Sequence, residues 1–162
     1  AILPATAASF HALFPHPQVR VRWLVDVAQP GEGQPPSFPA RHERMLDSLP
    51  AEAEDVYFMF LADDTRVDPR LLHVWMAMPS SGVMWMFRQS HAVAERPAWG
   101  EELDNGQAII SLRAHRAAGV RYYAHGWERH YFRHLQSLWP TEVRLHDSEC
   151  LTHHDLITRT LP

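Results

Sequence analysis

Residues 56–69 read VYFMFLADDTRVDP, and this stretch decides the predicted fold. Its first six residues (VYFMFL) form a short apolar and aromatic run that is typical of a buried strand. Two acids, Asp63 and Asp64, follow directly. Asp68 and Pro69 then match a helix cap with proline at the first helical position. A strand that delivers acids into a capped helix is expected at the carboxyl end of a strand in an α/β sheet, where ligands bind.

The rest of the chain alternates between strand-like and helix-like segments. Apolar runs predict further strands at residues 19–27, 83–87, 107–112 and 142–145. Helical spacing and end signals predict helices at residues 40–49, 68–78, 113–118 and 127–138. No element is predicted for the irregular residues 89–106 or for 149–162. The alternation predicts a single compact α/β domain over residues 1–162, a three-layer α/β/α fold with a mostly parallel central sheet.

The composition is that of an ordinary folded protein, with 46% hydrophobic and 21% charged residues. The formal charge is −4, and the fifteen basic residues, all arginine, are scattered, which disfavours a nucleic-acid partner. Cys150 is the only cysteine, so no internal disulfide can form. No apolar run approaches the ~20 residues that span a bilayer, and residues 1–14 do not resemble a signal peptide. We therefore expect no integral membrane segment and a cytoplasmic location.

The paired acids can hold a metal ion if they lie at a sheet edge. Carboxylates placed there bind hard cations through oxygen, and Mg²⁺ or Mn²⁺ can bridge to substrate phosphates. Adjacent aspartates after a strand are also common in ordinary turns. The residues alone therefore leave a metal site and a plain turn open.

The acidic segment resembles glycosyltransferases with the GT-A fold, especially the large family 2 group. In that group a hydrophobic strand ends in a DxD-type motif, which is followed a few residues later by proline and a helix. Residues 61–65 (LADDT) stand in that place here. The last acid of the motif, usually the metal ligand, falls on Asp64. The first acid falls on Ala62, a departure for which Asp63 is the candidate replacement at the donor.

Other segments match the same family in order along the chain. Residues 2–6 (ILPAT) are similar to the opening strand with its proline-containing turn. Residues 23–26 (WLVD) are similar to the strand whose final aspartate, here Asp26, helps to hold the nucleoside. Residues 104–107 (DNGQ) resemble the polar element that introduces a later strand, and residues 126–128 (GWE) match an acid at a helix start near the acceptor.

The resemblance assigns roles to several of these residues. Glu128 is the candidate general base, which would take the proton from the acceptor hydroxyl, and Asp104 is the reserve base or a contact to the acceptor sugar. A late histidine, His153 or His154, would complete the metal site. Independently of the resemblance, Arg41 could contact a donor phosphate through its planar guanidinium, or be a solvated residue at a helix start.

The function implied by the resemblance is the metal-dependent, inverting transfer of a sugar from a nucleotide-diphosphate donor. The acceptor would be a hydroxyl group of a glycan, a lipid-linked molecule or another compound, and the cofactor would be Mn²⁺ or Mg²⁺. Two alternatives stay open: a non-catalytic nucleotide-sugar-binding module, and a zinc hydrolase that uses His125, His130 and His134. The expected glycine-rich phosphate loop of a nucleotidyltransferase is absent from the sequence.

Overall fold

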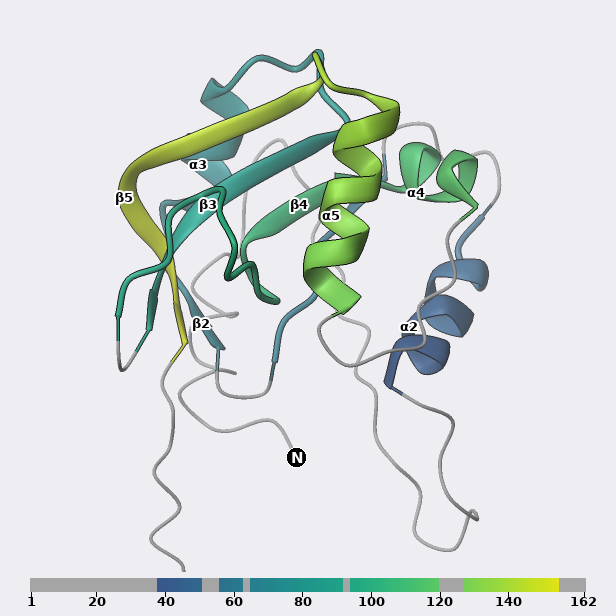
Figure 1. Ribbon diagram of the computed structural model, residues 1–162, viewed down its shortest axis with the longest axis horizontal. Coiled ribbons are helices and arrows are strands. Elements are labelled where there is room, and N and C mark those ends of the chain that lie inside the picture. Colours follow the sequence, from purple (N-terminus) through teal and green to yellow (C-terminus); the bar gives the residue numbers. More distant parts are fainter. Residues whose placement is uncertain (1–37, 51–55, 63–64, 92–93, 120–126, 155–162) are drawn as a thin grey trace, which may run out of the picture.

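A computed structural model describes residues 38–50, 56–62, 65–91, 94–119 and 127–154 (Figure 1). Its helices are α2 (Phe38–Asp47), α3 (Leu71–Ala77), α4 (Leu112–Ala118) and α5 (Trp127–Leu138). Its strands are β1 (Tyr57–Phe58), β2 (Thr65–Val67), β3 (Met84–His91), β4 (Ala108–Ser111) and β5 (Val143–His154).

The strands form one mixed sheet in the order β1-β4-β3-β5-β2. β4 is antiparallel to both of its neighbours, β1 and β3, and β2 is antiparallel to β5. Only β3 and β5 pair in parallel among the described strands. The sheet curls into a half-barrel, and the long, bent strand β5 follows that curve (Figure 1).

The predicted three-layer α/β/α fold with a mostly parallel sheet is therefore wrong. Parallel neighbours need a crossover connection, usually a helix, between them. The described part of the chain between β3 and β4 contains no helix, and β4 returns antiparallel alongside β3. The helices α4 and α5 lie in the connection from β4 to β5, and this connection leads to the parallel β3–β5 pair.

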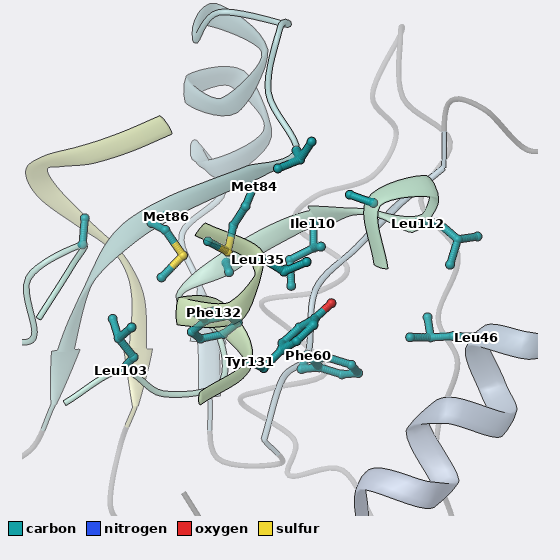
Figure 2. Close-up of a cluster of buried hydrophobic side chains, with 14 residues drawn as sticks. Leu46, Phe60, Met84, Met86, Leu103, Ile110, Leu112, Tyr131, Phe132 and Leu135 are labelled. Carbon is teal, nitrogen blue, oxygen red and sulfur yellow. The ribbon is translucent and has the colours of Figure 1, made fainter. Parts of the chain in front are cut away.

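The centre of the sheet is β3, whose first four residues, Met84 to Phe87, are all buried. Met84 and Met86 belong to one apolar cluster, which also contains the buried face of α5 (Figure 2). Trp85 and Phe87 belong to a second cluster, to which α3 contributes its two buried leucines. Both faces of β3 are thus covered, which explains why its sequence is continuously apolar instead of alternating.

Local signals placed both ends of α5 and the C-terminal end of α4 correctly. α5 has the predicted bounds. α4 ends as expected, because Gly119 adopts the left-handed conformation at its C-cap. α3 begins at Leu71, later than predicted, because the Asp68 carboxylate accepts the backbone N–H of Arg70 and stabilises a preceding turn. β3 and β5 both run further than predicted, and their extra residues supply two members of the candidate site, His91 and His154.

Candidate metal centre

The extended ends of β3 and β5 place two histidines side by side. In the parallel register Ser90 pairs with His153, and His91 pairs with His154. Successive residues of a strand point to opposite faces of the sheet. The rings of His91 and His154 stack with their centroids 4.7 Å apart and their planes only 7° from parallel. On the other face, the Ser90 hydroxyl lies 2.7 Å from His153 Nδ1.

Asp104 joins this histidine pair from the turn before β4. One potential ligand atom from each of His91, Asp104 and His154 lies within 4.8 Å of the other two, and all three residues are partly exposed. The turn is held by local hydrogen bonds: Asp104 Oδ1 accepts the backbone N–H of Asn105, and the backbone N–H of Asp104 donates to Gln107 Oε1. Gln107 is itself buried and donates to the backbone carbonyl of β3 residue Phe87. Asp104 is therefore anchored to the sheet that carries the two histidines.

These three side chains form a donor set that suits a divalent transition metal. Two imidazoles and one carboxylate on one side of an ion leave positions open for other ligands. Imidazole nitrogen favours Mn²⁺, Fe²⁺ or Zn²⁺ over Mg²⁺, which prefers oxygen ligands throughout. The ligand atoms come from a loop and two strands of one sheet, so much of their arrangement is fixed before an ion binds.

A layer of buried polar side chains lies next to the two histidines, two residues earlier on each strand. Gln89 pairs with Thr152, two residues before His91 and His154, and both are fully buried. Gln89 Nε2 donates to the backbone carbonyl of Asn105, at 2.9 Å. Three buried atoms of this layer, Gln89 Oε1, Asn105 Oδ1 and Thr152 Oγ1, have no hydrogen-bond partner in the described structure. Buried polar atoms of this kind are usually satisfied by ordered water.

Arg96 borders the group next to Asp104. Its Nη1 lies 3.4 Å from Asp104 Oδ2 and donates to the backbone carbonyl of Glu102 at 3.2 Å. Two backbone hydrogen bonds, of 2.9 and 2.8 Å, tie Arg96 to Gln89 of β3. A fixed cation therefore lies beside the only carboxylate of the group.

β2 connects the group to the end of the acidic segment. Thr65 is the Cα partner of His154, and its hydroxyl lies 3.5 Å from His154 Nδ1. Thr65 directly follows Asp63 and Asp64 in the sequence. Those two aspartates lie outside the described residues. The residues on either side of them are joined by a hydrogen bond, in which the backbone N–H of Thr65 donates to the backbone carbonyl of Ala62.

The structure brings together two of the residues that the sequence singled out, Asp104 and His154, and separates His153 from them. Glu128 lies in the first turn of α5, half-buried, and is not a member of the group. Asp26 lies outside the described residues, as do Asp63 and Asp64. The backbone of Arg41 belongs to α2, and its side chain is outside the described part.

His91 is the member of the group that sequence reasoning missed. Residues 89–91 (QSH) lie at the end of β3, and they belong to the stretch that was predicted to be irregular because it is polar. The available signal was a strand that becomes polar towards its end, as strands do where they leave the core. Of the histidines of the zinc alternative, His125 is outside the described residues, while His130 and His134 on α5 belong to no set of three potential ligands within them.

Searches of family models, curated proteins and solved structures find no match to this chain. Across the described helices, none combines the length and the apolar character needed to cross a membrane.

Proposed function

We propose that the protein binds a divalent metal ion through His91, Asp104 and His154, and uses it to transfer a sugar from a nucleotide-diphosphate donor to a hydroxyl acceptor. The observation that carries the proposal is the convergence of these three side chains beside Thr65, the residue that follows the acidic segment. Motif order singled out Asp104 as the reserve base and His154 as one of two candidate metal ligands, and the geometry groups both with His91.

The acidic segment supports a polyanionic donor at this place. Thr65, the residue after Asp64, contacts His154. The acidic segment is therefore next in the sequence to a residue that touches the candidate metal group. A divalent ion bound there would offset the negative charge that develops on a departing diphosphate. We propose that Asp64 adds an oxygen ligand to the set.

The roles of the carboxylates then separate. Asp104 belongs to the metal group, where a bound cation would weaken it as a base, so we propose it as a ligand and no longer as the reserve base. Glu128 remains the proposed general base for the acceptor hydroxyl. Its place in the first turn of a twelve-residue helix favours the ionised form that this role needs.

The proposed cofactor is Mn²⁺ in preference to Mg²⁺, since two of the three ligands are imidazoles. The neighbouring histidines on β5 provide a matched pair of variants to test this site. His154→Gln removes a proposed ligand, whereas His153→Gln alters the next residue, which faces the opposite side of the sheet. We expect Mn²⁺ affinity, measured by electron paramagnetic resonance of the free ion, to fall at least tenfold in His154→Gln and to stay within twofold in His153→Gln.

The transfer itself is tested by donor consumption. UDP-, GDP- and dTDP-sugars are offered with Mn²⁺, before and after EDTA, to the wild type and to His154→Gln and Asp64→Asn. We expect turnover that EDTA abolishes, and a loss on the order of a hundredfold in each variant, as for the removal of one preorganised electrostatic group. Equal Mn²⁺ binding by the two histidine variants would refute the metal site. Metal binding without turnover of any donor would leave a metal-binding protein and refute the transferase.

A further inference from the structure

We propose that Arg96 and the metal ion together form a binding site for a phosphate-type dianion. The inference rests on the proposed metal site and adds to it the residue that selects the charge of the ligand. Arg96 is the cation next to Asp104, and no role for it follows from the metal group alone.

The position of the guanidinium leaves one edge available. Both of its side-chain contacts, the ion pair with Asp104 Oδ2 and the hydrogen bond to the Glu102 carbonyl, are made by Nη1. Its Nε and Nη2 have no hydrogen-bond or ion-pair partner among the described residues. The Arg96 side chain is about one-fifth exposed, and its backbone is fixed to β3. The free donors therefore belong to a side chain whose base is held in place beside the metal group.

The charges of the group favour an anion. Counting formal charges, a divalent ion with the carboxylates of Asp104 and Asp64 and two neutral imidazoles is about neutral, and Arg96 makes the local total about +1. A phosphate or diphosphate group is attracted by that positive charge and offers several acceptor oxygens. A guanidinium can donate two parallel hydrogen bonds to such a group, while the metal accepts another of its oxygens.

Arg96 should affect the metal and the anion in opposite directions. Its positive charge repels a cation bound at Asp104 and competes for the same carboxylate oxygen, so its removal should leave Mn²⁺ affinity unchanged or increase it. The same removal takes donors and charge away from the anion. A merely structural role, in which Arg96 only positions the Asp104 turn, would weaken both ligands together.

The experiment measures both ligands on the intact chain. Free Mn²⁺ is followed by electron paramagnetic resonance. Inorganic phosphate is followed by the broadening of its ³¹P signal when it binds near protein-held Mn²⁺, with acetate as the monoanionic competitor. The first variant is Arg96→Gln. Arg96→Lys keeps the positive charge but loses the planar guanidinium that can donate two parallel hydrogen bonds. Arg113→Gln, at an exposed position on α4, is the control.

We expect phosphate affinity to fall about tenfold or more in Arg96→Gln, as for the loss of a charge-assisted pair. We expect a smaller fall in Arg96→Lys and none in Arg113→Gln, with Mn²⁺ held at least as tightly in all three. Acetate should compete poorly. Unchanged phosphate affinity in Arg96→Gln, or a fall in Mn²⁺ affinity that parallels the fall in phosphate affinity, would refute the role of Arg96 but not the metal site. A wild type that holds no Mn²⁺ would refute the metal site itself.

Discussion

His115 is expected to destabilise the folded protein as the pH falls below neutrality. The side chain is buried, its Nδ1 lies 2.9 Å from the Tyr131 hydroxyl, and its ring packs edge-on against Phe58. Burial lowers the pKa of His115 to about 4; Asp47 opposes this shift and Arg116 adds to it. The folded protein therefore favours the neutral imidazole.

The sign and size of the effect follow from the two pKa values. The ordinary histidine pKa is 6.5, so the unfolded chain takes up a proton well before the folded protein does. The stabilisation from a neutral His115 is complete above pH 6.5 and is lost progressively as the pH falls towards 4. At 1.36 kcal/mol per pH unit, the interval between the two values sets an upper limit of roughly 3 kcal/mol.

The assay is urea unfolding of the metal-free protein at several pH values between 7 and 4.5. In His115→Gln, which does not titrate, we expect the loss of unfolding free energy over this range to be smaller than in the wild type by roughly 2 kcal/mol. His130→Gln, an exposed position on α5, is the control and should keep the wild-type dependence. If wild type and His115→Gln lose stability in parallel, burial does not hold the imidazole neutral and the reasoning fails.

Two further predictions concern the supports of the site and of the helices. Gly106 has φ +85°, and an added Cβ would lie 3.0 Å from the Thr65 side chain, so Gly106→Ala should cost about 2–3 kcal/mol of unfolding free energy. Gly119→Ala, with φ +63° and open space around it, should cost only about 1 kcal/mol, and equal costs would contradict the close contact. Arg116 donates to three backbone carbonyls at and just after the end of α2, so Arg116→Gln should cost about 1–2 kcal/mol in urea unfolding. Arg113→Gln, exposed on the same helix, should change it by under about 0.5 kcal/mol, and a comparable loss there would show that the carbonyl contacts contribute little.

Short-range signals explain what the sequence predicted correctly. The apolar face of α5, the glycine after α4 and the apolar run of β3 act over a few residues, and each element is where those signals indicated. Asp68 shows their limit, since its side chain caps a turn before α3 and the helix starts later than the motif suggested. Ends of elements are decided by competing local hydrogen bonds that a pattern does not rank.

Strand direction could not be predicted from the same signals. A strand buried on both faces is continuously apolar whether its neighbours are parallel or antiparallel, so the run in β3 fits either arrangement. The direction of β4 depends on how the connection after β3 returns, and polar residues 94–107 gave no sign of that path. The predicted parallel sheet came from alternation of elements, which the antiparallel return of β4 contradicts.

Some residues of the candidate site could be found from the sequence, and others only from the tertiary structure. The sequence by itself singled out Asp104 and His154 as residues of interest, because side-chain type and motif order are properties of the chain. It could not choose between His153 and His154, since that choice depends on which face of β5 turns towards β3. It could not include His91 either, because the three potential ligands lie apart in the chain and meet only through the tertiary structure. Register is set by long-range packing of the buried residues, and so the tertiary structure alone decided which side chains converge.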